Sequence, residues 1–457
     1  MHKITQLFLS CLFLLAISGK VDAQTITTLA GKGTPGYYGN GSSALTANLH
    51  WPQGVAIDDT GNMYIADALN NVVRKVSTNG KISTIAGTGW EFGTGLGGFA
   101  GDFGPATAAR LWGPSGVAVD KHGFIYIADH NNNRIRKIDT GAGHMITTLA
   151  GNGFAGFSGD GASADLAQLS HPNRVVVDTF GTVFIADTGN HVIRMVDTLG
   201  MITTVAGTGA VAGYSGDGGA ATAATMNHPV DVAVDLFGNL YIVDMYNYVI
   251  RKVSISSGNI STICGIGTPG FSGDGRAATT AQLYDPSAIC VDHFGAIYIS
   301  DLGNMRIRKI DVGGKIRTIA GKGVSGFSGD GGPATAAELM FPNGLAVNAF
   351  GNVCFADQGN NRIRFMSITL GANSIDNTDD GLTLYPNPCQ GLFNINIPSA
   401  MNELATVVIT NAAGVKVKEL ILSTNTENQV EFNPPPGIYF ISANTSQDNW
   451  NQKLLVK

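Results

Sequence analysis

Charged residues are scarce in this sequence, because Asp, Glu, Lys and Arg together make up only 14% of its 457 residues. The balance is acidic, with a formal net charge of −6. No nucleic-acid partner is therefore expected, since proteins that bind phosphate backbones present strongly basic faces. Long apolar runs are also absent after the first 23 residues. The sequence therefore predicts no transmembrane segment.

The apolar run near the start belongs to another class of segment. Lys3 precedes an apolar stretch at residues 7–17, and residues 21–23 offer small side chains for cleavage. A positive end, a short apolar run and a small-residue site are typical of a secretory signal peptide. Residues 1–23 are therefore predicted to be a signal peptide, and the mature protein to be exported.

Cysteine is sparse, with five residues in the whole sequence and four after the predicted cleavage site. An exported protein could pair these four in disulfides. Three of them, Cys264, Cys290 and Cys354, occupy positions that hold Ala, Ala and Tyr in other copies of an internal repeat. We therefore interpret these three as buried free thiols that behave as small hydrophobic side chains.

Glycine, by contrast, is abundant at 61 residues, as in all-β proteins with many tight turns. The pattern Ile-Thr-Thr-Leu-Ala-Gly recurs with variations at Ile26, Ile82, Ile146, Ile202, Ile260 and Ile316. Each copy contains four short runs rich in Val, Ile and aromatic residues, which are bounded by Gly, Asp or Asn and predict strands. Six copies of four strands predict an all-β, six-bladed β-propeller at residues 24–369.

The order of the strands predicts how the ring closes. The chain begins with an outermost strand at Ile26 and ends its last copy after only three strands, near Ile368. Pairing of the first strand with the strand at residues 362–368 completes the sixth blade and removes an exposed edge.

Short motifs in each copy resemble NHL repeats. Residues 114–120, 125–129 and 133–138 show them as Pro-Ser-Gly-Val-Ala-Val-Asp, Ile-Tyr-Ile-Ala-Asp and Asn-Arg-Ile-Arg-Lys-Ile. The resemblance covers all six copies and implies a six-bladed propeller. Members of this family are mostly binding platforms for proteins or RNA. Related propellers include a peptide-amidating lyase and an antibiotic-inactivating lyase, so the resemblance leaves catalysis open.

The C-terminal part is similar to the sorting domain of the type IX secretion system (type A). It contains Leu-Tyr-Pro-Asn-Pro at residues 384–388, Pro-Gly-Ile-Tyr-Phe at 436–440 and Lys-Leu-Leu-Val-Lys at 453–457. The resemblance implies passage through the periplasm and the outer membrane, followed by release or surface attachment, with the secretion machinery as a partner. We expect a linker at residues 370–381 and a small sandwich-like β-domain at 382–457.

Every copy carries an Asp, an Asn three residues later and an Arg four residues further on. Six identical sets indicate scaffolding, because catalysis requires an asymmetric group, and Asp or Asn side chains commonly bond turn backbone. A recurring Gly-Asp-Gly loop, followed in the last copy by a short helix predicted at residues 333–339, is likewise expected to serve turns and helix caps, since one Asp per loop is too few for calcium. The predicted structural residues are Asp67, Asp129, Asp187, Asp244, Asp301, Asp357, Arg74, Arg136, Arg194, Arg251, Arg308 and Arg364.

Function is expected where the copies differ. The turn before each innermost strand and the connection between the second and third strands lie on one face, because antiparallel strands alternate in direction. Variable residues there are the ligand-binding candidates: Trp51, His130, His171, His228, Tyr246, Asp285 and Phe341. His171, His228 and Asp285 share one slot of three consecutive copies and are candidate metal ligands. A polar rim and ordinary surface loops are the alternatives.

Signatures of catalysis are missing from the sequence. It contains no nucleophile elbow, phosphate loop, zinc-protease helix or cofactor fingerprint, so no cofactor is expected. The sequence favours a non-enzymatic, exported or surface-attached scaffold that binds a protein, peptide or glycan at one face of the propeller. A lyase or hydrolase at the channel mouth and a structural cell-surface component stay open as alternatives.

Overall fold

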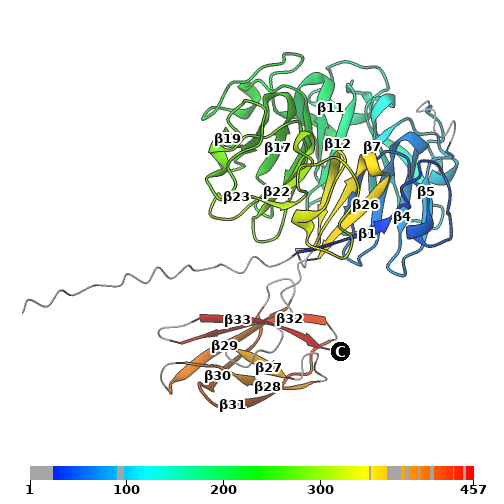
Figure 1. Cartoon of the computed structure of the whole chain (residues 1–457). Helices are drawn as coiled ribbons and strands as arrows, with labels where there is room; N and C mark the ends of the chain where they lie inside the picture. The colour runs from blue at the N-terminus through cyan, green and yellow to red at the C-terminus, as the bar shows by residue number, and fades with distance from the viewer. Residues whose placement is uncertain are drawn as a thin grey trace, which may run out of the picture. The chain divides into compact units, whose positions relative to one another are not determined.

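A computed structural model describes residues 24–89, 97–348, 351–367, 382–385, 389, 391–399, 402–411, 416–435, 437–445 and 449–456. The chain divides into two compact units, one up to Gly371 and one from Ala372 (Figure 1). The predicted signal peptide at residues 1–23 and the predicted linker at 370–381 lie outside the described residues.

The first unit consists of six antiparallel sheets, which form the blades of a propeller (Figure 1). Blades 2 and 3 gain a fifth, two-residue strand at their outer edges, β6 (Gly104–Pro105) and β11 (Ala162–Ser163). From the axis outward, blades 1 to 3 comprise β2 (Pro52–Ile57), β3 (Met63–Asp67), β4 (Val72–Val76) and β5 (Ile82–Ala86); β7 (Pro114–Val119), β8 (Ile125–Asp129), β9 (Arg134–Ile138) and β10 (Met145–Ala150); and β12 (Pro172–Val177), β13 (Val183–Asp187), β14 (Val192–Val196) and β15 (Met201–Ala206).

The sixth blade closes the ring, and its pairing confirms the predicted closure. Strand β1 (Thr25–Ala30) pairs with the last strand of the repeats, so that Thr25 faces Ser367 and Ile26 faces Met366. Blades 4 to 6 comprise β16 (Pro229–Val234), β17 (Leu240–Asp244), β18 (Val249–Val253) and β19 (Ile260–Cys264); β20 (Pro286–Val291), β21 (Ile297–Asp301), β22 (Arg306–Ile310) and β23 (Ile316–Ala320); and β24 (Pro342–Val347), β25 (Val353–Asp357), β26 (Arg362–Ser367) and β1.

The two ends of the propeller differ in their connections. One end, here called the helix face, carries the starts of the innermost strands and a 3-10 helix between the second and third strands of each blade. These helices are η2 (Ala68–Asn70), η4 (His130–Asn132), η6 (Thr188–Asn190), η8 (Met245–Asn247), η10 (Leu302–Asn304) and η12 (Gln358–Asn360). The opposite end, the hairpin face, carries the turns that join the first strand to the second and the third to the fourth.

The core lies between neighbouring blades, because each sheet is covered on both sides. One cluster joins Tyr126 and Ala128 of blade 2 to Val175 and Ile185 of blade 3. Small side chains occupy the middle of the innermost strands, where the blades meet around the axis. These residues are Ala56, Ala118, Val176, Ala233, Cys290 and Ala346.

A buried arginine anchors the outer loop of each blade to its sheet. The six repeat arginines are fully buried, and each lies 3.0–3.5 Å from the repeat Asp of its own blade. In blades 2 to 6 the same guanidinium also lies 2.5–2.9 Å from an aspartate of the outer loop. Those loop aspartates are Asp102, Asp160, Asp217, Asp274 and Asp330.

These ion pairs correct the prediction for the Gly-Asp-Gly loops. The aspartates bind arginine rather than capping a helix, and the expected helix at 333–339 is a single 3-10 turn, η11 (Ala334–Ala336), with no side-chain cap. Its counterparts are η1 (Ala44–Thr46), η3 (Ala106–Ala108), η5 (Ala164–Leu166), η7 (Ala221–Ala223) and η9 (Ala278–Thr280). In blade 1 the amide oxygen of Asn40 replaces the loop carboxylate, 3.1 Å from Arg74.

The second unit is a small β-sandwich, as the sequence predicts. One sheet holds β27 (Thr383–Tyr385), β28 (Leu392–Asn396) and β31 (Glu427–Glu431). The other holds β30 (Lys416–Ser423), β29 (Leu404–Asn411), β32 (Gly437–Asn444) and β33 (Asn449–Val456). Their inner faces bury Phe393, Ile395, Val407, Ile441 and Leu454, among others.

The four described cysteines are free thiols. Cys264 and Cys354 are buried between blades, and burial raises the pKa of both thiols to about 12. Cys290 is half-buried on the axis, where burial is again the main cause that raises its thiol pKa. The interpretation as buried free thiols therefore holds for Cys264 and Cys354, whereas Cys290 is a free thiol that is only half-buried.

Candidate functional site

Six equivalent residues on the helix face adopt a left-handed backbone conformation. Each directly precedes the proline that starts an innermost strand, and glycine, which favours this conformation, occupies the position only in blade 2. For other residues the left-handed conformation costs about 1–2 kcal/mol. The residues and their φ angles are Trp51 (56°), Gly113 (58°), His171 (49°), His228 (55°), Asp285 (47°) and Phe341 (52°).

A second ring of left-handed residues follows the 3-10 helices of the same face. These residues are Asn71, Asn133, His191, Tyr248, Met305 and Asn361, with φ between 52° and 60°. In five blades their side chains accept a hydrogen bond from the next blade. The backbone N–H of Trp51 donates to Asn361 Oδ1 at 2.8 Å, and that of His228 donates to His191 Nδ1 at 3.1 Å. The equivalent acceptors for Gly113, His171 and Phe341 are Asn71, Asn133 and the Met305 sulfur.

The side chains of the two rings and their neighbours meet as aromatic and imidazole pairs. Ring centroids are 6.1 Å apart for Trp51 and Phe341, 5.2 Å for His130 and His171, and 4.5 Å for His228 and Tyr246. Three further rings that the sequence did not single out join them: His191, Tyr248 and Tyr284. We call this set the rim: Trp51, His130, His171, His191, His228, Tyr246, Tyr248, Tyr284, Asp285 and Phe341.

Internal hydrogen bonds fix the protonation of two rim imidazoles. His130 Nδ1 lies 3.2 Å from the carbonyl oxygen of Pro172, which can only accept, so this nitrogen carries the proton. His191 Nδ1 accepts the amide of His228, so there the other nitrogen carries it. Burial lowers the pKa of both groups, to about 4 for His130, where the neighbouring His171 adds to the effect. These two imidazoles are therefore neutral at pH 7.

The structure does not assemble the three candidate metal ligands into one site. Within the described ranges, no group of three or more His, Cys, Asp or Glu side chains is placed to hold a metal ion. His171 pairs with His130, whereas His228 packs between His191 and Tyr246. Each imidazole is thus held on its own sector of the rim, so that adjacency in the repeat does not bring His171, His228 and Asp285 together.

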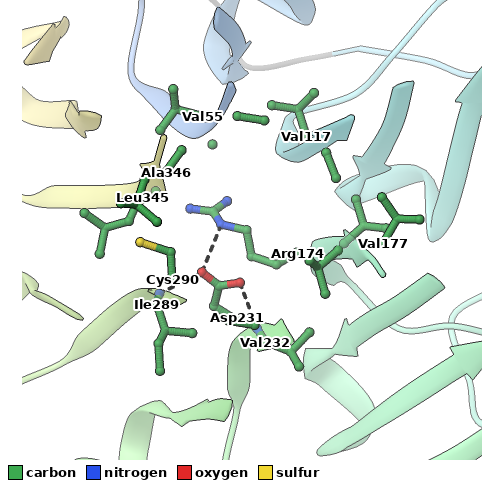
Figure 2. A pocket seen from close by; sticks show the side chains of 18 of the residues that line it. Val55, Val117, Arg174, Val177, Asp231, Val232, Ile289, Cys290, Leu345 and Ala346 are labelled. Atoms are coloured by element: carbon green, nitrogen blue, oxygen red, sulfur yellow. Dashed lines mark hydrogen bonds and ion pairs between the residues drawn. The ribbon is translucent and has the colours of Figure 1, made fainter. Parts of the chain in front are cut away.

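Below the rim, an ion pair on the axis departs from the repeat (Figure 2). Four blades have Gly54, Gly116, Ala288 or Gly344 at the third position of the innermost strand, whereas blades 3 and 4 have Arg174 and Asp231. Both side chains are almost fully buried, and Arg174 Nε lies 3.8 Å from Asp231 Oδ2. This pair was not predicted from the sequence, although two large charged residues in a position that otherwise holds Gly or Ala were a visible signal.

The ion pair links the six blades. Arg174 of blade 3 donates to the carbonyl oxygens of Gln53 in blade 1 and Ser115 in blade 2, and to Asn343 Oδ1 in blade 6. Asp231 of blade 4 accepts the backbone N–H of Ile289 in blade 5 at 3.0 Å. One guanidinium and one carboxylate therefore tie every blade to the axis.

The pair also forms the floor of the central channel. This channel has a volume of about 210 Å³, and its walls run from the level of Arg174 to Ile57, Val177 and their equivalents at the strand ends. Those strand ends lie at the hairpin face, so the channel runs from the ion pair towards that face. Arg174 and Asp231 thus stand between the rim and the channel.

Comparison with known proteins identifies both units. The profile of the family described as "Teneurin NHL domain" matches residues 25–94, 153–215 and 267–326, and that described as "NHL repeat" matches residues 111–138. The profile described as "Secretion system C-terminal sorting domain" matches residues 383–457. The combination of the two units predicted from the sequence is thereby confirmed.

Curated relatives share the propeller over only part of their length. Protein SUPPRESSOR OF QUENCHING 1, chloroplastic, of Arabidopsis thaliana is 29% identical over 349 residues, which span 73% of this chain and 32% of that protein. Human Teneurin-4 is 30% identical over 280 residues, 53% of this chain and 10% of that protein. The chain thus spans a third or less of the length of these relatives.

A solved structure with the same fold is an auxiliary nutrient binding protein from Bacteroides ovatus. The match has a TM-score of 0.53 and 13% sequence identity, and it covers 76% of this chain and 77% of that one. Among the described residues of the present chain, no helix is long and apolar enough to cross a membrane.

Proposed function

We propose a binding function for this chain, which is an NHL-repeat β-propeller that ends in a secretion-system sorting domain. The sorting domain indicates export through type IX secretion, to the cell surface or the surrounding medium. In our proposal the partner is an extracellular protein, peptide or glycan, and its site is the rim on the helix face.

The observation that carries this proposal is the placement of backbone strain. Five of the six positions before the innermost strands hold Trp, His, Asp or Phe in a conformation that suits glycine. Gly113 shows that glycine is compatible with the same turn. On the hairpin face, by contrast, glycine fills the equivalent left-handed positions at Gly61, Gly123, Gly181, Gly238, Gly295 and Gly351. Among the described residues of the hairpin-face turns, His144 is the one non-glycine residue in this conformation, with φ 43°. Strain that is concentrated on one face is typical of a functional surface.

The chemistry of the rim suits recognition more than catalysis. Its rings offer apolar faces, the hydroxyls of Tyr246 and Tyr284 are on exposed residues, and two of its imidazoles are neutral. Tyr and Trp of this kind are enriched at binding surfaces. Ser170 Oγ lies 3.3 Å from His171 Nδ1, but the ring of His171 packs on His130 rather than on a carboxylate that could orient it. The ion pair of Arg174 and Asp231 lies between the rim and the central channel, and so separates the two.

The test substitutes glycine into the strained positions. A variant with Trp51→Gly, His171→Gly, His228→Gly and Phe341→Gly copies the turn of blade 2. We expect thermal stability to be kept or raised, because each change relieves strain, and binding to be lost. Binding would be measured for the full chain on arrays of extracellular polysaccharides and peptides, and on the surface of intact cells.

Two matched results would contradict the proposal. Unfolding of the glycine variant at a clearly lower temperature would show that the four side chains serve the fold. Unchanged binding would move the site elsewhere. The control is Gly113→Ala, which adds strain in the one blade without a rim side chain at this position, and which should lower stability while leaving binding intact.

A further inference from the structure

The hairpin face carries a second unusual feature, a set of exposed apolar side chains on three adjacent blades. They stand on the turns of blades 3, 4 and 5 and are between 58% and 86% exposed. We call them the apolar tips: Phe180, Leu199, Leu236, Phe237, Ile255, Phe294 and Val312. Single exposed apolar residues are common on protein surfaces, but seven of them on the turns of three adjacent blades mark this face as a candidate binding surface.

The turns themselves do not require apolar residues. In five blades the turn between the first two strands is closed by an aspartate that accepts the N–H two residues later, at 2.8–3.0 Å. The residue that donates this N–H is Thr60 in blade 1 and His122 in blade 2, but Phe180, Phe237 and Phe294 in blades 3 to 5. The same backbone is thus built with polar tips in blades 1 and 2.

Side chains at the base of the turns also accept hydrogen bonds from the backbone N–H groups of the apolar tips. The N–H groups of Phe180, Phe237 and Phe294 are bonded to their aspartates, and that of Leu199 donates to Asp197 Oδ1 at 2.9 Å. The N–H of Ile255 donates to Asn239 Oδ1 at 3.2 Å. Transfer of these tips into an apolar medium therefore leaves none of these five amides without a partner, which avoids the cost of burying them unpaired.

The chain leaves the propeller at this same face. Strand β26 runs from the helix face to the hairpin face and ends at Ser367, where it pairs with Thr25. The segment that leads to the sorting domain begins directly after Ser367. If the sorting domain holds the protein at the cell surface, the hairpin face is the end of the propeller from which the tether departs.

We propose that the apolar tips of blades 3, 4 and 5 dock the propeller on a lipid surface. The seven tips are spread over six separate turns of three blades, so the set suits a fluid apolar layer, which accepts side chains at any spacing. A protein partner needs a matched pocket for each anchor. Carboxylates at the base of the turns, such as Asp178, Asp197 and Asp311, favour zwitterionic over anionic lipid.

The experiment is flotation of the full exported chain with vesicles of phosphatidylcholine and phosphatidylethanolamine. We expect the wild type to float at low and high salt, and less of it to float when phosphatidylglycerol is added. A variant with Phe180→Thr, Phe237→Thr and Phe294→Thr, which places the residue type of Thr60 in three further blades, should bind these vesicles at least tenfold more weakly with an unchanged melting temperature. Phe154→Thr, which removes an exposed phenylalanine from another part of the propeller, should float like the wild type.

Three results would overturn the proposal. They are a wild type that does not float, a triple variant that floats equally well, and self-association. Self-association would be seen in sedimentation as dimers of the wild type that the triple variant does not form, in the absence of vesicle binding. The apolar tips would then join copies of the chain. None of these results bears on the rim, which lies at the opposite face.

Discussion

Arg174 and Asp231 show how two residues can change a symmetric scaffold. Burial of a charge costs several kcal/mol, and that cost is offset only when the charge is paired and its remaining hydrogen-bonding atoms are satisfied. The guanidinium reaches acceptors in three blades besides Asp231, and the carboxylate accepts the amides of Val232 and Ile289. Burial still dominates, because it raises the pKa of Asp231 to about 6 although Arg174 opposes this shift.

The first prediction concerns this ion pair. Asp231→Asn removes the carboxylate and leaves the buried guanidinium without its counter-ion, so we expect the free energy of unfolding to fall by about 3–5 kcal/mol. The double variant Arg174→Met, Asp231→Leu should lose less, because it leaves no buried charge. Urea unfolding of the propeller measures both. Equal urea midpoints for Asp231→Asn and the wild type would contradict the structural role.

The second prediction concerns His130. Its pKa is about 4 in the folded protein, below the ordinary value of 6.5, because burial and His171 disfavour the charged form. Neutral His130 is thus fully compatible with the fold above pH 6.5, and stability is lost as the pH falls from 6.5 towards 4. The loss should amount to about 3 kcal/mol at pH 4.

A matched variant isolates this contribution. In blade 3, Thr188 Oγ1 donates to the carbonyl oxygen of Pro229, as His130 Nδ1 does to that of Pro172. His130→Thr therefore keeps the hydrogen bond and removes the titration. The difference in unfolding free energy between wild type and variant, followed from pH 7 to pH 4, should change by the predicted amount. A constant difference over this range would refute the assignment.

At the scale of elements, the strands could be predicted from the sequence and the loops could not. Apolar runs bounded by Gly, Asp and Asn recur in each copy, so local patterns identify the strands and their order. The outer loop is held instead by contacts between residues 34 positions apart, such as Arg194 with Asp160. An aromatic side chain such as Phe157 also stacks on each repeat arginine. The pattern of residues within a single strand or loop does not indicate which distant residues pair in this way.

The third prediction tests the element that closes the ring. Deletion of residues 24–31 removes β1, which contributes its pairing with β26, a hydrogen bond between the hydroxyls of Thr25 and Ser367, and one from Thr28 to Asp330. Blade 6 would then expose the edge of β26, and the whole propeller should melt at a lower temperature in one transition. Removal of residues 1–23 alone is the control. An unchanged melting temperature after the longer deletion would show that β1 is dispensable.

At the scale of the whole molecule, a symmetric ring carries asymmetric features at three levels. These are the rim on the helix face, the ion pair on the axis and the apolar tips on the hairpin face. The sequence predicts the rim position, because the residue before each proline varies among copies. It does not predict which rim side chains meet, since His191 and Tyr248 follow the helices and reach the next blade. Neighbouring slots such as those of His171 and His228 therefore do not form one metal site.

The last prediction concerns the division of labour between the two units. The propeller has its own closed ring and inter-blade clusters, and the sandwich has a separate core around Phe393 and Val407. Truncation after residue 370 keeps all six blades and removes the sorting domain. We therefore expect the truncated propeller to unfold at the same temperature as in the full chain, but to accumulate in the periplasm. Fractionation of cells that produce either form measures this distribution. Fusion of residues 370–457 to another periplasmic domain should export that domain, as the complementary control. Normal export of the truncated propeller would mean that the blades themselves carry the export signal. Their repeated, inward-facing residues give no physical reason to expect such a signal.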